Sequence, residues 1–208
     1  MKLKIEGLSA GYDKDFVIKD LSLSVNQGEF LSLLGPSGCG KTTLMKAVAG
    51  ILPAQGGRIL LDGEDITGLP IHKRGTVIVF QDMRLFPHMT VEENVAFPLK
   101  MQGKLNTENG KEKVEHMLNV IGLESFRDDY PGQLSGGMAQ RVALVRTLIS
   151  QPEILLLDEP LGALDAFTRM NMQDEILAMW KERKQLALMV THDVDEAIYM
   201  GTRVIVMD

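Results

Sequence analysis

The sequence of 208 residues is poor in cysteine, in excess basic charge and in long apolar runs, and each shortage excludes a class of protein. The single cysteine, Cys39, excludes a disulfide framework and any metal site built from several cysteines. Lysine and arginine number 22 against 28 aspartate and glutamate, so the net charge of −6 argues against a nucleic-acid partner. No apolar run reaches the roughly 18 residues of a membrane span, and no secretory segment precedes the first β pattern. We expect a soluble intracellular protein.

Hydrophobic residues make up 45% of the chain, and their spacing predicts an α/β fold. Four dense apolar runs show no alternation, which is typical of strands that are buried on both faces of a parallel sheet. These runs are residues 30–34, 76–80, 153–157 and 186–190. Shorter β segments are expected at residues 2–6, 17–25 and 58–61, and Asp62-Gly63 marks a turn after the last of them.

The region of residues 82–151 differs from the rest because its apolar spacing is helical. Thr90 and Glu93 match a capping box, in which each side chain accepts a hydrogen bond from an otherwise unpaired backbone N–H at the start of a helix. We interpret the region as a helical insertion in a single domain. That domain spans residues 1–208, with its core in residues 1–81 and 152–208.

The strongest motif is a glycine-rich phosphate loop that follows the apolar run at residues 30–34 and precedes a predicted helix. Its glycines allow successive backbone N–H groups to point inward at phosphate oxygens, and the helix N-terminus adds partial positive charge. The Lys41 ammonium can reach the β and γ phosphates, and the Thr42 hydroxyl is an oxygen ligand suited to Mg²⁺. The motif comprises Gly35, Pro36, Ser37, Gly38, Cys39, Gly40, Lys41 and Thr42.

An acidic pair, Asp158 and Glu159, follows the apolar run at residues 153–157. The run delivers both carboxylates to the carboxyl edge of the sheet, where ligands bind in open α/β sheets. Asp158 would hold Mg²⁺, and Glu159 would orient or deprotonate the attacking water. Alone, such a pair is more often a solvated strand end. The phosphate loop in the same chain makes the catalytic interpretation the stronger one.

Four further motifs complete a pattern along the chain. They are Gln81 after a strand, Leu134-Ser135-Gly136-Gly137 before a helix, Leu164-Asp165 after the acidic pair, and His192 at a strand end. With the phosphate loop, the ordered set resembles the ATP-binding subunit of ATP-binding cassette (ABC) transporters from about residue 2 to residue 208. The resemblance implies an α/β P-loop ATPase fold with a mostly parallel core sheet, an N-terminal antiparallel β part and an inserted helical part.

The resemblance also implies ATP and Mg²⁺ as cofactors and a role for each matching residue. The implied catalytic residues are Glu159, His192 and Gln81, and the implied ligands of Mg²⁺ are Thr42, Gln81 and Asp158. The implied nucleotide contacts outside the loops already named are Tyr12 at the adenine, Val17 beside it, Thr43 and, at a subunit interface, Asp165. The histidines that match no functional position and are expected at the surface are His72, His88 and His116.

Ser135, Gly136 and Gly137 form a second small-residue loop at a helix N-terminus, and therefore a second anion-binding surface in one chain. This loop has no lysine and no base-binding aromatic of its own, which indicates half of a shared site. In the family, two subunits associate head to tail, and this loop covers the ATP held by the partner's phosphate loop. The resemblance thus implies a homodimer, or a pair with a related ATPase subunit.

Residues 81–95 resemble importer subunits, particularly those for polyamines, sulfate, iron or molybdate. In such subunits this region receives a cytoplasmic helix of the permease. Its apolar lining, or alternatively part of the helical core, would be Leu85, Phe86, Met89 and Phe97. The implied protein lies on the cytoplasmic face of the cell (inner) membrane, binds integral permease subunits, and is served indirectly by a solute-binding protein.

Three alternatives stay open on the sequence. A soluble ABC ATPase for cofactor assembly, or an exporter subunit, would carry the same motifs. A P-loop kinase or switch GTPase would leave the Ser135 loop and His192 unexplained, and the Asn-Lys-x-Asp motif that reads guanine is absent from the sequence.

Overall fold

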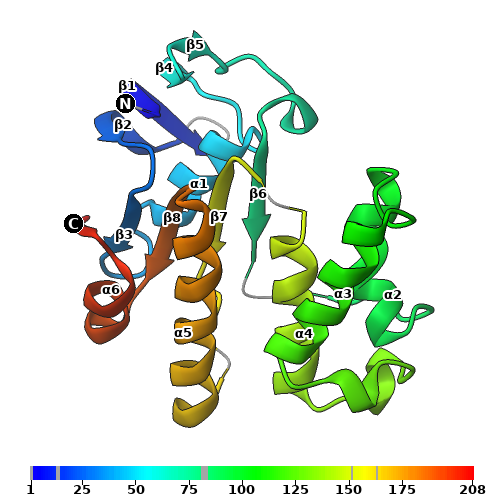
Figure 1. The fold of residues 1–208 in the computed structure, drawn as a ribbon. Coiled ribbons are helices and arrows are strands. Elements are labelled where there is room, and N and C mark those ends of the chain that lie inside the picture. The colour runs from blue at the N-terminus through cyan, green and yellow to red at the C-terminus, as the bar shows by residue number, and fades with distance from the viewer. Residues whose placement is uncertain (1, 13–14, 81–83, 151, 163) are drawn as a thin grey trace. The chain divides into compact units, whose positions relative to one another are not determined.

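The computed structural model of the chain is shown in Figure 1. It describes residues 2–12, 15–80, 84–150, 152–162 and 164–208, with only the backbone of Glu108. Internal contacts divide the chain into two units. Unit 1 comprises Met1–Ile78, Pro152–Glu159 and Ile176–Asp208, and unit 2 comprises Val79–Gln151 and Pro160–Glu175.

Unit 1 contains a four-stranded antiparallel sheet in the order β2-β1-β4-β5. Its strands are β1 (Leu3–Tyr12), β2 (Asp15–Val25), β4 (Gly56–Leu61) and β5 (Glu64–Asp65). Asp62 and Gly63 connect β4 to β5 with φ angles of 49° and 85°. Positive φ at both central residues is the geometry of a two-residue hairpin turn, which an Asp-Gly pair favours. The predicted turn and the predicted antiparallel part are therefore both confirmed.

A second sheet has the order β6-β7-β8-β3-β9, and the pairs β7–β8, β8–β3 and β3–β9 are parallel. Its strands are β3 (Phe30–Leu34), β6 (Thr76–Val79), β7 (Ile154–Asp158), β8 (Leu186–Thr191) and β9 (Arg203–Val206). β7 and β8 are buried along their whole length, as their continuous apolar runs predict. For β6 the expectation of burial on both faces is wrong. Val77 and Ile78 are only half-buried, because β6 lies at the edge of the sheet.

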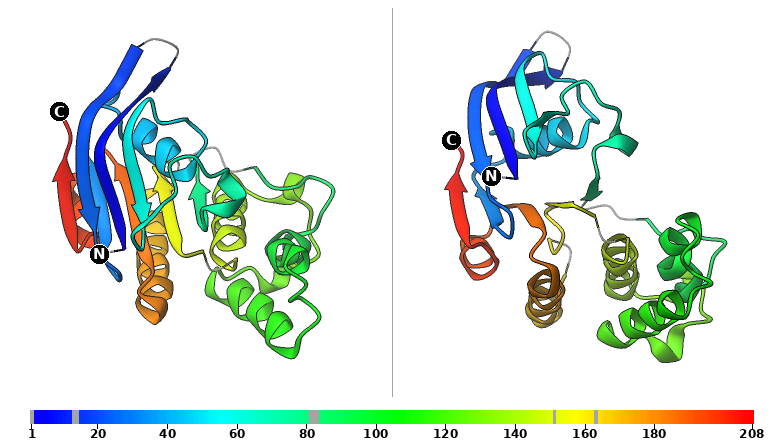
Figure 2. Two further views of the ribbon diagram at one scale, coloured as in Figure 1. Left: turned by 90° about the horizontal axis from the view of Figure 1, so that it is seen from above. Right: turned by 45° about the horizontal axis from the view of Figure 1, so that its top comes forward.

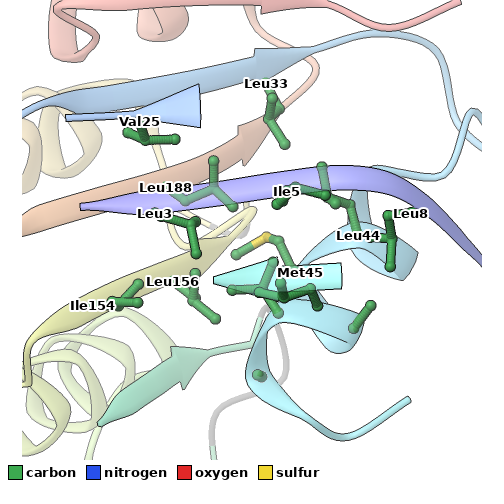
Figure 3. Packing of buried hydrophobic residues seen from close by; sticks show 14 of the residues in the cluster. Leu3, Ile5, Leu8, Val25, Leu33, Leu44, Met45, Ile154, Leu156 and Leu188 are labelled. Atoms are coloured by element: carbon green, nitrogen blue, oxygen red, sulfur yellow. The ribbon is translucent and has the colours of Figure 1, made fainter. Parts of the chain in front are cut away.

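Helix α1 (Lys41–Ala49) packs against both sheets, since it contacts β1 and β2 of one sheet and β7 and β8 of the other. Met45 of this helix belongs with Ile5 and Leu156 to one cluster of buried apolar side chains (Figure 3). Burial of a side chain of this size contributes roughly 1.5–3 kcal/mol, so the cluster fixes α1 and the phosphate loop that precedes it. Helix α6 (Val194–Met200) lies on the opposite face of the parallel sheet and contacts β3, β8 and β9 (Figure 2).

Unit 2 is mainly helical. Its helices are α2 (Val91–Met101), α3 (Glu108–Val120), α4 (Gly136–Leu148) and the first part of α5 (Ala166–Arg183). The predicted capping box at the start of α2 is confirmed: the Thr90 hydroxyl accepts from the Glu93 N–H at 3.2 Å, and the Glu93 carboxylate accepts from the Thr90 N–H at 2.9 Å. Single 3₁₀ turns occur at Ile71–Lys73 in unit 1 and at Glu124–Phe126 and Pro131–Gln133 in unit 2. None of the helices in the described ranges is long and apolar enough to cross a membrane.

A buried arginine ties the end of α1 to the segment before β6. Arg74 is 4% exposed, and its guanidinium donates to the carbonyls of Ala47 and Val48, in the last turn of α1, at 2.8 and 3.1 Å. It also donates to the carbonyls of Thr67 and Leu69 at 2.6 and 2.8 Å. One planar cation therefore donates to four carbonyl groups, because its N–H donors are spread in a rigid fork.

Replacing Arg74 with methionine should lower the free energy of unfolding by about 3 kcal/mol or more, because buried carbonyls lose their donors. Arg74→Lys should recover only part of this loss, since one ammonium cannot match the fork geometry. Urea denaturation measures both variants. Arg58→Met is the matched control, because Arg58 is exposed and makes a surface ion pair with Glu6 at 3.0 Å. Its effect should stay below about 1 kcal/mol, and equal losses for the two methionine variants would contradict this account.

Candidate functional site

The loop between β3 and α1 curls because its glycines adopt backbone angles that other residues avoid. Gly38 has a φ of 90° and Gly40 a φ of 101°, in the left-handed region that a Cβ atom disfavours. Gly35 has no space for a side chain, because a Cβ there would lie 2.2 Å from the Met207 carbonyl oxygen. The loop thus has the curled backbone that binding of an anion by N–H groups requires, directly before the N-terminus of α1.

The side chain of Lys41 is 5% exposed and folds back onto this loop. Its ammonium donates to the carbonyls of Gly35 and Pro36 at 2.8 and 2.7 Å, and it lies 3.6 Å from the sulfur of Cys39. A buried cation needs such partners, because an uncompensated charge away from water costs several kcal/mol. The loop carbonyls therefore hold the ammonium inside the loop.

A pocket of about 350 Å³ lies over the loop, within unit 1. The residues that line it, each predicted as a nucleotide contact or a catalytic residue, are Tyr12, Val17, Ser37, Gly38, Gly40, Lys41, Thr42, Thr43 and Glu159. Lys46 was not predicted. Its ammonium donates to the Tyr12 hydroxyl at 3.2 Å and lies 5.7 Å from the centre of the Tyr12 ring. The spacing of four residues after Thr42 puts Lys46 on the same face of α1, and this signal could have identified it.

Asp158 ends β7 next to α1, and its Oδ1 accepts a hydrogen bond from the Thr42 hydroxyl at 3.0 Å. Burial raises the pKa of its carboxyl above the ordinary value of 3.8. The Thr42 hydrogen bond opposes this rise in pKa, the charge of Glu159 adds to it, and the ammonium groups of Lys46 and Lys41 oppose it weakly. The Thr42 hydroxyl oxygen and the Asp158 carboxylate oxygen thus lie side by side in a poorly solvated place. Mg²⁺ prefers oxygen ligands of this type.

Glu159 follows with a strained backbone, since its φ of 47° is uncommon for a residue other than glycine. Its N–H donates to the Val190 carbonyl at 3.0 Å, which ties this turn to β8. Its carboxylate lines the pocket, and Oε2 lies 3.4 Å from Nδ1 of His192. The structure therefore brings together two predicted catalytic residues from separate strand ends.

The Ser135 loop lies in unit 2 at the start of α4, where the Ser135 hydroxyl accepts from the Met138 N–H at 3.3 Å. Neither Gly136 nor Gly137 has a positive φ. Among the described residues, a Cβ on Gly136 would meet no atom within 4 Å, and a Cβ on Gly137 would make only an ordinary contact of 3.8 Å with Leu164. The fold of unit 2 therefore gives no steric reason for glycine at these two positions.

Asp165 lies just before α5, also in unit 2, and its Oδ1 accepts from the Thr168 N–H at 3.0 Å. Hydrogen bonds from Thr168 lower the pKa of the Asp165 carboxyl below 3.8. Gln81, predicted as a catalytic and metal-binding residue, lies outside the described residues. The three histidines expected at the surface are indeed exposed: His72, His88 and His116.

The predicted groove residues are all half-buried within unit 2: Leu85, Phe86, Met89 and Phe97. Phe86 and Phe97 pack with ring centres 4.7 Å apart. A fully buried amide that the spacing did not reveal holds this segment. Asn94 donates to the carbonyls of Phe86 and Met89 at 3.2 and 3.1 Å. Arg146 of α4 donates to Asn94 Oδ1 at 3.2 Å and lies 4.8 Å from the centre of the Phe86 ring.

Sequence comparison relates the chain to curated proteins over nearly its whole length. The profile of the family described as ABC transporter matches residues 18–162. The spermidine/putrescine import ATP-binding protein PotA of Mannheimia succiniciproducens is 46% identical over 205 residues, which cover 99% of this chain and 55% of that protein. The aliphatic sulfonates import ATP-binding protein SsuB of Bacillus cereus is 43% identical over 211 residues, which cover 100% of this chain and 81% of that protein.

Two solved structures are similar in fold. One is the dimeric structure of a post-hydrolysis state of an ATP-binding cassette bound to ADP and Pi, with a TM-score of 0.85 at 30% identity, covering 99% of this chain and 94% of that chain. The other is the dimeric structure of a bacterial ABC transporter cassette, with a TM-score of 0.84 at 30% identity and the same coverage of 99% and 94%. The fold predicted from the motifs is therefore confirmed.

Asp158→Asn should stabilise the nucleotide-free protein, because it removes a carboxylate that burial penalises and keeps an oxygen that can accept from Thr42. The folded-state pKa of Asp158 lies above 3.8, so its charged form costs stability at neutral pH. That cost disappears as the pH falls through the raised pKa. Calorimetry should show a melting temperature about 2–4 °C higher for each kcal/mol gained in the free energy of unfolding. The difference in melting temperature between Asp158→Asn and the parent should shrink toward acid pH.

Asp165→Asn is the control of opposite sign, because hydrogen bonds from Thr168 lower the pKa of Asp165. The charged form of Asp165 contributes stability that is present above pH 3.8 and is lost as the pH falls through the lowered pKa. This variant should be no more stable than the parent at neutral pH. An Asp158→Asn protein that melts below the parent at every pH would contradict the penalty assigned to Asp158.

Proposed function

The chain belongs to the ABC transporter family, and on that premise we propose that it is the ATP-binding and ATP-hydrolysing subunit of a transporter that imports a solute. Two copies would associate head to tail and close around ATP, and hydrolysis would let them separate. PotA and SsuB are both named import ATP-binding proteins, which supports import over export and over a soluble assembly role. The chain spans about half the length of PotA, so the solute and the activity of the whole protein are part of the proposal.

ATP would bind over the phosphate loop, in the pocket that Tyr12, Lys41 and Thr42 help to line. Triphosphate oxygens would take over the Lys41 ammonium from the carbonyls of Gly35 and Pro36. The exchange is favourable, because the ammonium would then face anionic phosphate oxygens, which attract it more strongly than neutral carbonyl oxygens do. The adenine would stack on Tyr12, which is 48% exposed and whose hydroxyl accepts a hydrogen bond from Lys46.

The residues at the carboxyl end of β7 fit Mg²⁺. Thr42 Oγ1 and Asp158 Oδ1 are oxygen donors 3.0 Å apart, and a cation would compensate the Asp158 carboxylate, whose pKa is raised by burial. When bound, Mg²⁺ neutralises charge on the transferred phosphoryl group. Gln81 is proposed as a third ligand on the family resemblance alone.

Glu159 is proposed to orient the attacking water, and His192 to hold the Glu159 carboxylate and contact the γ-phosphate. The distance of 3.4 Å between Oε2 and Nδ1 and the shared β7–β8 hydrogen bonding keep the two side chains at one place. Phosphoryl transfer requires little covalent chemistry from the protein, so positioning and charge supply most of the catalysis. Gln81 is proposed to approach the same water and to link the site to the helical part.

The observation that carries the two-copy mechanism is the pair Gly136 and Gly137. Glycine in the middle of a helix is less stable than alanine by roughly 0.5–1 kcal/mol, which is an upper limit for Gly136 and Gly137 in the first turn of α4. Unit 2 has glycine at both positions, although a Cβ at either one would meet no clash among the described atoms. Close approach of a group from outside the chain explains the missing side chains, and the ATP of a partner copy is the group proposed. Asp165 would lie at the same interface.

The proposed location of the protein is the cytoplasmic face of the inner membrane. There the chain would bind integral permease subunits through the segment around Phe86 and Phe97, whose shape is fixed by Asn94 and Arg146. A solute-binding protein would act on the complex indirectly. The identity of the solute would be set by those other subunits.

Lys41→Ala should weaken ATP binding at least about tenfold, because it removes a charge-assisted contact to phosphate worth more than about 1.4 kcal/mol. Titration calorimetry with ATP measures the affinity, and thermal melting checks that the loop variant remains folded. Lys19→Ala is the control, since Lys19 is exposed on β2 and does not line the pocket. An unchanged affinity in Lys41→Ala would refute the proposed site.

A Glu159→Gln background tests the two-copy mechanism, because ATP should still bind while hydrolysis slows strongly. With ATP and Mg²⁺, light scattering should then show dimers. Adding Gly136→Ala and Gly137→Ala should prevent dimer formation, since two methyl groups would occupy the space of the partner's ATP. The same changes should raise the free energy of unfolding of the monomer, by up to about 1 kcal/mol each.

Gly132→Ala is the matched control, because a Cβ there would likewise meet no described atom within 4 Å. It should leave dimer formation intact. Full dimer yield in the Gly136 and Gly137 variants, or a Glu159→Gln protein that stays monomeric with ATP and Mg²⁺, would count against the mechanism.

A further inference from the structure

A buried carboxylate outside the pocket holds the turn that carries His192. Glu196 of α6 is 6% exposed, and Thr191, the last residue of β8, is 2% exposed. The Thr191 hydroxyl donates a hydrogen bond to Oε2 of Glu196 and accepts one from the Asp193 N–H at 3.1 Å. Asp193 Oδ1 accepts from the Glu196 N–H at 3.0 Å. These three residues form a closed ring of hydrogen bonds that flanks His192 on both sides.

Packing does not hold His192, since its side chain is 64% exposed. Its reach to Glu159 therefore depends on the backbone from which it projects. On one side that backbone is fixed by the pairing of β8 with β3 and β7. On the other side it is fixed by the bond between the Asp193 N–H and the Thr191 hydroxyl.

The direction of that bond is set by Glu196. A hydroxyl group has one proton to donate, and an ionised carboxylate can only accept. Because the Thr191 proton goes to Glu196, a lone pair of the same oxygen is left to face the Asp193 N–H. Without the carboxylate, the hydroxyl is free to rotate and to donate elsewhere.

Stability alone does not account for a carboxylate at this position. Burial deprives the carboxylate of its hydration, and the replacement of buried charged groups by apolar side chains of similar volume is often neutral or stabilising. We propose that Glu196 is a positioning residue, which acts through Thr191 to fix the turn that aims His192 at Glu159. The consequence for hydrolysis rests on the proposed function, whereas the effect on the position of His192 does not.

Two matched pairs of variants test this role. Thr191→Val keeps the shape of the side chain and loses the hydroxyl, whereas Thr191→Ser keeps the hydroxyl. Glu196→Met keeps the approximate volume and loses the acceptor, whereas Glu196→Gln keeps an acceptor oxygen. Thr191→Val and Glu196→Met should lower kcat about 10- to 100-fold, as expected for a misplacement of about 1 Å, with ATP affinity within about twofold of the parent. Thr191→Ser and Glu196→Gln should retain kcat within about threefold.

The signals of the histidine rings provide a second readout that needs neither nucleotide nor activity. In protein labelled with ¹⁵N-histidine, the His192 signals are identified by their loss in His192→Asn. They should shift or broaden in Thr191→Val and Glu196→Met, and keep their positions in Thr191→Ser and Glu196→Gln. The signals of the other three histidines should stay unchanged, which a general loosening of the fold would not produce.

A coupling test separates action through His192 from any other effect. In a His192→Ala background, Thr191→Val should lower the residual single-turnover rate no further. An additive loss, unchanged His192 signals in Thr191→Val and Glu196→Met, or an unchanged kcat in those variants would each overturn the proposal. If the parent hydrolyses no ATP, the proposed function fails, and the ring signals alone decide the role of Glu196. If Thr191→Val does not fold, the Glu196 pair carries the same test.

Discussion

The buried ammonium of Lys41, closed onto the carbonyls of its own loop, is the contact on which the proposed nucleotide site in unit 1 depends. It requires left-handed backbone at Gly38 and Gly40, and it requires that α1 begin at a fixed place. The apolar cluster between the two sheets fixes the body of α1, and Arg74 holds its last turn. Both sheets, one helix and one buried arginine therefore serve to hold a single cation where phosphate would bind.

Several features at or behind the proposed site are unfavourable for the chain by itself. Burial raises the pKa of Asp158, and Glu159 has a positive φ that residues other than glycine avoid. Glu196 buries a carboxylate behind the turn that carries His192. Such costs persist only where the surrounding structure is stable enough to impose them, and they concentrate at functional sites. Here the continuous buried strands β7 and β8 supply that rigid support. Asp158 and Glu159 lie at the end of β7, and Glu196 is hydrogen-bonded to Thr191 at the end of β8.

The two units contribute different halves of the proposed mechanism. Unit 1 contains the phosphate loop, the acidic pair, His192 and the pocket beside them. In the proposed mechanism, a second copy of the chain would cover this pocket. Unit 2 contains a capped helix start whose two glycines serve no steric need of the fold. In the proposed mechanism a partner copy gives these glycines their purpose, because each copy would supply the half-site that the other lacks.

Local motifs determined most of what could be predicted. The phosphate loop, the Asp62-Gly63 turn and the capping box at Thr90 depend on residues close together in the sequence, so their geometry follows from residue type. Only the tertiary structure decided which strand lies at an edge, since β6 has the same apolar run as the central strands. It also decided the partners of Arg74, Asn94 and Glu196, none of which the spacing revealed. Hydrogen-bond partners of buried polar groups depend on how helices and strands that are distant in the sequence pack together. The periodicity of a sequence does not specify that packing.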